Sequence, residues 1–347
     1  MTFSRVLSKA ILELRKEYLG LRRVEGGRPV RAWIEEDRVL GERGRALVVV
    51  LATRGCSWAL SEHGGCSMCG YIYEGVKGDV SSEQIVNQFK GAYRKASSAK
   101  PPMAVKIFTS GSFLDENEVP EDAQNEILWF ISKDPRVKEV VLETRPSFVT
   151  VENVSRCVQA LKGKQLTIAV GLETVNDKVR KVINKGFTFM EFKKAMDVAK
   201  ALGARVKVYL LVKPPFLREE EAIIDTENSI ITLSEMGVDV ISLNPCTVHK
   251  GTFVELLWKK GDYRPPWLWS LVKIIQDVYR EIDTTLICVP VASGSPRGPH
   301  NCGVCDKRVD GALRKFSLSQ NVSEIEKLSC SCKPAWESYR YEEMISM

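Results

Sequence analysis

The chain has 347 residues, of which 44% are hydrophobic and 27% charged, close to the average for soluble globular proteins. At roughly 100 to 200 residues per domain, this length allows two or three domains, or one large α/β barrel with appendages. No apolar run approaches the roughly 18 residues that a membrane span needs, and residues 1–20 lack the apolar core of a signal peptide. We therefore expect a cytoplasmic protein without membrane contact.

Basic residues are in modest excess, with 50 Lys and Arg against 44 Asp and Glu and a net charge of +6. This balance is compatible with an RNA or phosphate-rich partner, and dispersed surface charge is an equal alternative. The ten cysteines favour metal ligands or catalytic groups over disulfides, because the cytoplasm is reducing. The basic residues that are candidate phosphate contacts are Arg15, Lys16, Arg22, Arg23, Lys307 and Arg308.

Three regions follow one another along the chain. Residues 1–45 form an N-terminal extension, with an amphipathic helix pattern at 5–18 and a strand-like stretch at 30–35. Residues 46–294 alternate short apolar runs with amphipathic stretches of roughly 10 to 20 residues. Residues 295–347 form a Cys-rich region with expected helices at 309–316 and 323–328. The apolar runs expected as strands are 46–53, 104–111, 139–144, 166–173, 206–212 and 238–244, and 286–294 is a seventh strand or a return segment.

These strand candidates are apolar on both faces, which is typical of parallel strands covered by helices. Ser81 or Ser82 is placed to cap the first of those helices. No Gly-x-Gly-x-x-Gly turn follows the first strand. The pattern therefore favours a partial or full parallel β/α barrel over a dinucleotide-binding sheet.

The strongest local motif is TRGCSWALSEHGGCSMCGY, directly after the first expected strand, which contains Cys56, Cys66 and Cys69. This Gly-rich loop lies at the carboxyl end of a strand, where β/α barrels place their chemistry. Three thiolates can hold three irons of a 4Fe-4S cluster and leave the fourth iron open for a substrate. The alternatives are a structural zinc completed by a ligand such as His63, or three cysteines packed as small hydrophobic residues.

A second set of cysteines lies near the carboxyl terminus, as a Cys-x2-Cys pair followed by a Cys-x-Cys pair. Four thiolates in two close pairs are what a tetrahedral structural zinc needs. His300 could replace one of them, and an auxiliary iron-sulfur cluster or unliganded thiols are the alternatives. Such a metal would pin a tail too short to form its own core. The four residues are Cys302, Cys305, Cys330 and Cys332.

Three cysteines after the first strand of a β/α barrel resemble the signature of the radical S-adenosylmethionine (SAM) superfamily. The nine-residue gap between Cys56 and Cys66 is similar to the branch that contains the elongator-type tRNA-modifying enzymes. The resemblance implies a 4Fe-4S cluster whose open iron binds the amino and carboxylate groups of SAM. It also implies that an electron from the cluster cleaves SAM to a 5′-deoxyadenosyl radical.

The same resemblance implies SAM contacts at later strand ends. Glu143 and Arg145 in LETRP resemble the Glu-x-Arg-Pro of the elongator-like branch, and Glu173 is placed like the residue that binds the SAM ribose. For each charged residue, an ion pair at the barrel rim is the alternative. A turn that departs from the usual Gly-Gly-Glu form would bind the SAM amino group through its backbone, and it consists of Thr109, Ser110, Gly111 and Ser112.

Later strand ends carry further polar residues that could hold a substrate. Lys213 follows the fifth strand, and Asn244, Cys246 and His249 end or follow the sixth. Lys213, Cys246 and His249 are the candidates for a catalytic role, which the sequence does not otherwise assign. Packing is the alternative for a single Cys or His at a strand end.

Three stretches together resemble one narrower family, the radical SAM component of archaeosine synthase: RPVRAWIEEDRVLG, the first cysteine motif, and GPHNCGVCDKRVDGALRKFSLSQ with CSCKPAW. The resemblance implies a lyase that cleaves the lysine adduct of a 7-deazaguanine base at tRNA position 15 and leaves a formamidine. It implies three partners: tRNA, a lysine-transferring subunit related to transglycosylases, and an electron donor. The alternatives are another elongator-like radical SAM tRNA enzyme, or a non-enzymatic zinc-bound RNA-binding scaffold.

Overall fold

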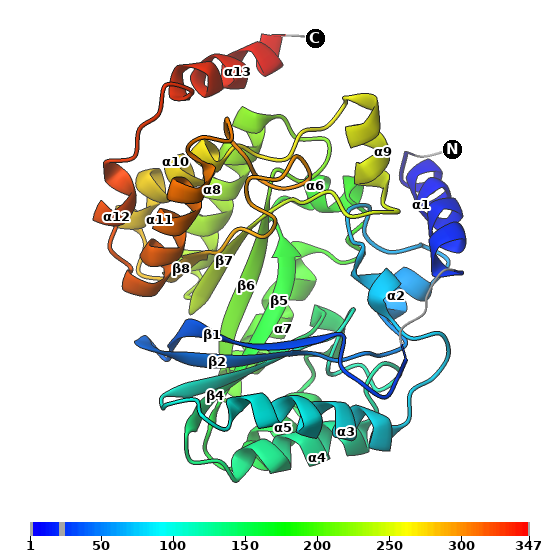
Figure 1. Cartoon of the computed structure of the whole chain (residues 1–347). Helices are drawn as coiled ribbons and strands as arrows, with labels where there is room; N and C mark the ends of the chain where they lie inside the picture. Colours follow the sequence, from blue (N-terminus) through cyan, green and yellow to red (C-terminus); the bar gives the residue numbers. More distant parts are fainter. Residues whose placement is uncertain (1–2, 21–24, 346–347) are drawn as a thin grey trace.

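The computed structural model describes residues 3–20 and 25–345. Their strands form one curled sheet that pairs in sequence order, a partial barrel open at one side (Figure 1). β1 and β2 form an antiparallel hairpin, and every later pair is parallel. The strands are β1 (Arg31–Val39), β2 (Glu42–Val50), β3 (Met103–Phe108), β4 (Val137–Glu143), β5 (Gln165–Glu173), β6 (Arg205–Val212), β7 (Val240–Pro245) and β8 (Thr285–Cys288).

Helices connect the parallel strands and cover the outer face of the sheet (Figure 1). The connecting helices are α3 (Ser82–Tyr93), α4 (Glu121–Ser132), α5 (Val151–Leu161), α6 (Asp177–Val182), α7 (Phe189–Ala201), α8 (Glu219–Glu235), α9 (Phe253–Lys260) and α10 (Leu268–Val278). Ser81 is the N-cap of α3: its side chain accepts a hydrogen bond from Gln84 N, and the Gln84 side-chain oxygen accepts one from Ser81 N. Short 3-10 turns are η1 (Tyr71–Glu74), η2 (Arg94–Ala96), η3 (Pro146–Phe148) and η4 (Tyr279–Glu281).

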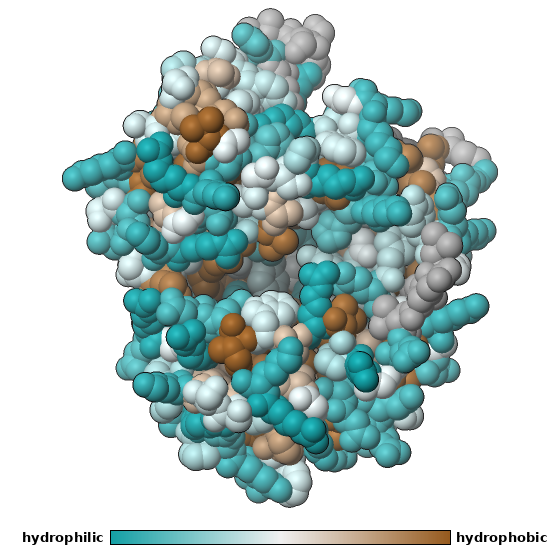
Figure 2. Space-filling view, in the orientation of Figure 1, coloured by the Kyte–Doolittle hydropathy of each residue, from teal (hydrophilic) through white to brown (hydrophobic). Residues whose placement is uncertain are grey.

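The alternation of side chains along each strand separates the core from the inside of the barrel. On β6, Val206, Val208 and Leu210 join the main core beneath the helices, so Lys207 and Tyr209 point to the inner face of the sheet, which we call the lumen. The space-filling view in the same orientation shows a hollow in the middle of this face of the molecule (Figure 2). Polar side chains on the inner face of a buried sheet are available for chemistry rather than for packing.

The termini extend this barrel. The chain begins with α1 (Phe3–Leu19), and α2 (Ser57–Leu60) lies in the loop after β2. α11 (Asp306–Ser319) packs beside β8, and α12 (Ser323–Glu326) and α13 (Lys333–Ile345) complete the Cys-rich region. Within residues 3–20 and 25–345, no helix combines the length and apolar character that crossing a membrane requires.

The structure confirms the predicted partial barrel and adjusts its edges. The strand expected at 46–53 begins earlier, at Glu42, because it forms a hairpin with β1 through Leu40 and Gly41, both at positive φ. β1 itself lies in the segment expected to be an extension. The seventh strand forms but ends at Cys288, and Pro290 shortly after it cannot donate to a ladder.

Candidate active site

The loop between β2 and η1, residues 51–70, carries Cys56, Cys66 and Cys69 at the carboxyl end of the barrel. We call it the cysteine loop. Cys66 interacts electrostatically with both Cys56 and Cys69, and all three side chains are partly accessible. Burial raises the pKa of Cys56 to about 12 and also raises that of Cys69. Thiolates at these positions therefore need a metal or a cation to stabilise them.

Gly111 places the predicted SAM-binding turn directly against Cys56. A Cβ at Gly111 would lie 2.6 Å from Cys56 Cα and 2.6 Å from Glu118 Oε2, so only glycine fits. Arg145 N donates to Ser112 Oγ at 3.0 Å, and Ser110 Oγ donates to Tyr71 O at 3.1 Å. The turn after β3 is thus hydrogen-bonded to the strand end after β4 and to the start of η1, and it packs against Cys56 of the cysteine loop.

Glu118 organises this turn and was not found from the sequence. Its carboxylate is 2% exposed and accepts hydrogen bonds from Thr53 Oγ1 and Ser112 N, both at 2.7 Å. Burial raises its pKa to about 7. Glu118 lies in an acidic loop sequence, LDENEVP, where nothing distinguishes it from surface residues, so no local signal marked it.

The charged residues expected after β4 and β5 converge on the same mouth of the barrel. Glu173, at a positive φ of 71°, forms an ion pair with Lys185 at 2.6 Å. Arg145 donates to Lys185 O at 3.1 Å, and its guanidinium lies 5.4 Å from the Trp58 ring centroid. Among the described residues Arg145 forms no ion pair with Glu143. Burial, with the nearby Glu173 charge, raises the pKa of Glu143 to about 8.

Of the three catalytic candidates, His249 lies against the cysteine loop. Its ring meets the Tyr71 ring edge-on at 4.9 Å, and a Cβ at Gly70 would lie 2.5 Å from His249 Cβ. Burial and the charge of Arg297 lower the pKa of His249, so its imidazole is neutral at pH 7. This neutral ring can accept or donate a hydrogen bond beside the cysteines.

The other two candidates are more deeply buried. Lys213 is 1% exposed, and its Nζ lies 2.8 Å from Glu219 Oε2. Cys246 is 1% exposed and packs in a small apolar cluster with Met68 and Tyr263. Burial raises the pKa of the Cys246 thiol to about 12, so it is protonated and poorly nucleophilic at neutral pH.

The lumen carries polar residues that the sequence analysis did not single out. The Tyr209 hydroxyl is buried and has no hydrogen-bond partner among the described residues. Lys207 Nζ lies 5.2 Å from the Tyr209 ring centroid, and burial lowers its pKa to about 8. The signal was present, because KVY places two polar-tipped side chains at alternate positions of an otherwise apolar strand.

A pocket of about 410 Å³ opens beside the cysteine loop and α6. Trp58 and Phe187 contribute aromatic surface, and Arg180, Lys181 and Lys185 contribute positive charge. Aromatic and cationic groups together are suited to the bases and phosphates of a nucleotide. Asp177 and Glu191 also line it, so the charge is mixed.

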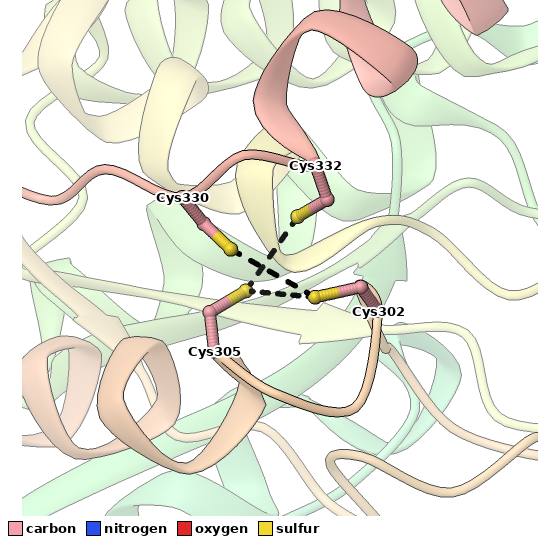
Figure 3. A group of neighbouring side chains, drawn as sticks. All are labelled: Cys302, Cys305, Cys330 and Cys332. Atoms are coloured by element: carbon pink, nitrogen blue, oxygen red, sulfur yellow. Dashed lines mark hydrogen bonds between the residues drawn. The ribbon is translucent and has the colours of Figure 1, made fainter.

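The four carboxyl-terminal cysteines converge on one point, as Figure 3 shows. Their sulfur atoms all lie within 4.8 Å of one another, and three of the pairs are separated by 3.7 to 3.8 Å. A regular tetrahedron with metal–sulfur bonds of about 2.3 Å has edges of about 3.8 Å. The geometry therefore fits a single ion better than a cubane, in which each cysteine binds a different iron.

Neighbouring residues support this four-sulfur site. Trp269 Nε1 donates to Cys332 Sγ and Asn301 Nδ2 to Cys305 Sγ, both at 3.3 Å. Such donors stabilise thiolates from outside the ligand set. His300 does not belong to the group, and its Nδ1 lies 2.8 Å from Gly298 O.

Two of the basic residues expected to contact phosphate, Arg15 and Lys16, lie on α1. The expectation was wrong for Arg15, because its side chain is buried. Lys16 is exposed, but Arg15 is 3% exposed and donates to backbone carbonyls of the cysteine loop. Arg22 and Arg23 lie outside the described residues. Lys307 and Arg308 are exposed on α11, beside the carboxyl-terminal cysteines.

Comparison with known proteins agrees with this arrangement. Residues 50–226 match the model of the radical SAM superfamily. Archaeosine synthase subunit beta of Methanosarcina acetivorans is 45% identical over 333 residues, covering 95% of each chain. The subunit of the same name from Thermococcus kodakarensis is 41% identical, covering 88% of this chain and 94% of its own. A solved structure of Methanocaldococcus infernus Elp3 with an N-terminal deletion is 14% identical, covers 63% of this chain and 55% of that one, and has a TM-score of 0.46. The chain therefore belongs to the radical SAM superfamily, and within it to the family of the archaeosine synthase beta subunits.

Proposed function

We propose that this chain is the radical SAM lyase that completes archaeosine in tRNA. It cleaves a carbon–nitrogen bond in the lysine adduct of the 7-deazaguanine base at position 15 and leaves the formamidine group. The observation that carries this proposal is the 45% identity to a curated archaeosine synthase beta subunit along 95% of both chains. The matched region extends over 95% of this chain, so it is not confined to the scaffold that the whole superfamily shares.

The superfamily implies a 4Fe-4S cluster and SAM, and the donor set fits them. Three partly accessible thiols on one glycine-rich loop can each bind one iron. We assign Cys56, Cys66 and Cys69 as these ligands. When bound, the cluster and SAM supply a carbon-centred radical strong enough to remove hydrogen from an unactivated methylene.

The chain's own residues position SAM at this mouth. The backbone of the turn from Thr109 to Ser112 passes close to Cys56 because Gly111 has no side chain, and it is available to the SAM amino group. Arg145, with no carboxylate partner among the described residues, is available to the SAM carboxylate, with Glu143 beside it. Glu173, held by Lys185, is placed to bind the ribose hydroxyls.

The lysine adduct would enter the lumen next to this group. Acid–base residues cannot remove a proton from an unactivated methylene, so the protein contributes by orienting the substrate and excluding water. The Tyr209 hydroxyl and the neutral His249 ring are suited to hold polar atoms of the substrate. The aromatic and cationic pocket beside α6 is suited to a neighbouring nucleotide.

Three partners follow from this assignment. The relatives' name, subunit beta, implies an assembly that acts on tRNA. We propose that the second subunit is the lysine-transferring, transglycosylase-related enzyme that prepares the adduct. A low-potential electron donor is also required, because each cleavage of SAM consumes an electron.

We further propose that Cys302, Cys305, Cys330 and Cys332 bind a structural zinc. The sulfur separations fit a tetrahedral ion, and the thiols link the start of α11 to the start of α13. A metal there would fix the Cys-rich region against the barrel.

The test is anaerobic incubation of the chain with SAM, a reductant and lysine-adducted tRNA. We expect release of 5′-deoxyadenosine together with archaeosine from the wild-type protein, and neither product from Cys66→Ala. Cys157→Ala, which changes a buried thiol on α5, serves as the matched cysteine control and should retain both. Release of 5′-deoxyadenosine without archaeosine would contradict the substrate assignment but not the radical chemistry. A colourless anaerobic protein with zinc bound at both cysteine sets would instead favour the scaffold alternative.

A further inference from the structure

A charged residue interrupts the buried stripe of α1. Leu7, Ile11 and Arg15 follow one another at four-residue spacing, so they share one face of the helix, and each is 3% exposed. Arginine is almost never so buried unless its charge is paired. The environment of Arg15 therefore has to supply a partner.

Three hydrogen bonds of Arg15 lead to carbonyls of the cysteine loop, and its guanidinium also lies 5.7 Å from the centroid of the neutral Tyr73 ring. Nη2 donates to Cys66 O at 2.9 Å and to Cys69 O at 3.3 Å, and Nε donates to Gly64 O. A Cβ at Gly65 would lie 2.7 Å from Ala59 Cα and 3.2 Å from Arg15 Nη2. Glycine at this position thus lets the guanidinium reach the loop backbone.

These contacts leave the charge itself unbalanced. Among residues 3–20 and 25–345, Arg15 forms no ion pair, and its Nη1 is buried without a hydrogen-bond acceptor. Backbone carbonyls are neutral, so they satisfy N–H groups but provide no counter-charge. The guanidinium instead lies against the backbone of Cys66 and Cys69, two of the three cysteines of the loop.

We propose that Arg15 is a positioning residue for the iron-sulfur cluster and that its buried guanidinium is the cluster's counter-charge. The inference rests on the assignment of the cluster to Cys56, Cys66 and Cys69, and not on the identity of the tRNA substrate. Three thiolates outweigh the charge of the oxidised iron-sulfide core, so the assembled group is an anion. Reduction adds a further negative charge, which a fixed cation beside it stabilises.

Two substitutions separate the charge of Arg15 from its hydrogen bonds. Arg15→Lys keeps the charge but loses the planar guanidinium that donates to three backbone carbonyls. Arg15→Gln removes the charge. Lys9→Gln is the matched control, because Lys9 is an exposed cation on the same helix. Each protein is reconstituted anaerobically, and its iron and sulfide are counted. The cluster midpoint potential is then measured by redox titration followed by electron paramagnetic resonance, and the fold by circular dichroism.

We expect Lys9→Gln to match the wild type, Arg15→Lys to keep a potential near it, and Arg15→Gln to shift to a more negative potential. Loss of iron from Arg15→Gln alone, with an intact circular dichroism spectrum, would support the same conclusion. An unchanged potential in fully loaded Arg15→Gln would overturn it. Equal loss of iron from both Arg15 variants would also overturn it, since the residue would then act only through its carbonyl contacts. Wild-type protein without a cluster would instead reject the ligand assignment.

Discussion

Gly111→Ala probes the contact between the SAM-binding turn and the cysteine loop. The new methyl group would lie 2.6 Å from Cys56 Cα, 2.7 Å from Cys56 Cβ and 2.6 Å from Glu118 Oε2. Carbon atoms do not approach so closely, so the turn or the loop has to move. Gly111 does not have a positive φ, so the cost comes from this steric clash and not from backbone strain.

The expected change in Tm follows from the cost of this clash and the length of the chain. Adding a methyl group to a packed site costs about 1 to 3 kcal/mol. Unfolding entropy is about 2.1 cal/mol/K per residue near the melting temperature, or about 0.7 kcal/mol/K for 347 residues. Gly111→Ala should therefore lower Tm by about 1.5 to 4 °C. Because the displacement moves Cys56, the reconstituted variant should also bind fewer irons.

Gly91→Ala is the matched control. Gly91 lies inside α3, and a Cβ there would meet no heavy atom within 4 Å. Alanine should stabilise this helix position by about 0.5 to 1 kcal/mol and raise Tm by about 1 °C. Differential scanning calorimetry can separate these opposite signs. If Gly111→Ala were as stable as Gly91→Ala and bound iron normally, the turn could not pack against Cys56 as described.

Three further predictions concern other parts of the molecule. Cys302→Ala should lose one zinc per chain and lower Tm, and normal zinc content by metal analysis would rule out this site. Tyr209→Phe should raise KM for the adducted tRNA about 2- to 10-fold, because a hydrogen bond contributes about 0.5 to 1.5 kcal/mol, while SAM binding stays unchanged. Burial and the charge of Asp277 raise the pKa of Glu227 to about 7. The folded protein thus keeps a proton that the unfolded chain releases, and stability falls as pH rises through about 7. The free energy of unfolding of Glu227→Gln, measured by urea titration, should therefore exceed that of the wild type by more at about pH 8 than at about pH 5. An equal difference at both pH values would refute this.

Local patterns were sufficient to predict the barrel. The parallel strands β2 to β8 are 4 to 9 residues long and mostly apolar, and the amphipathic stretches between them carry clear caps, such as Ser81 before α3. The hairpin of β1 was harder to assign. RAWIEEDRV is half polar, because one side of this edge strand meets solvent and Lys106 pairs with its Glu35 and Asp37. Its place in the sheet depends on pairing with β2, which its own sequence does not reveal.

Some residues of the candidate site could likewise be predicted from local sequence, and others could not. The cysteines were recognisable because their spacing within one loop is local. Glu118 and Arg15 were not, since their importance comes from contacts with residues far away in the chain. Glu118 resembles its acidic neighbours until the fold buries it beneath Ser112. Arg15 reads as a surface cation until α1 is laid against the cysteine loop.

The fold supplies one cation near each of the three loop cysteines. Burial raises the pKa of Cys56 and Cys69, and the charges of Arg145 and Arg15 respectively oppose that rise, while Lys185 interacts with Cys66. These cations come from α1, from the end of β4 and from the segment after α6, so no short motif contains them. Because thiolates buried without compensation are costly, these cations would lower the cost of ionising the three thiols when they bind the proposed cluster. The charges of the proposed site thus come from elements far apart in the chain, whereas its proposed ligands lie in a single loop.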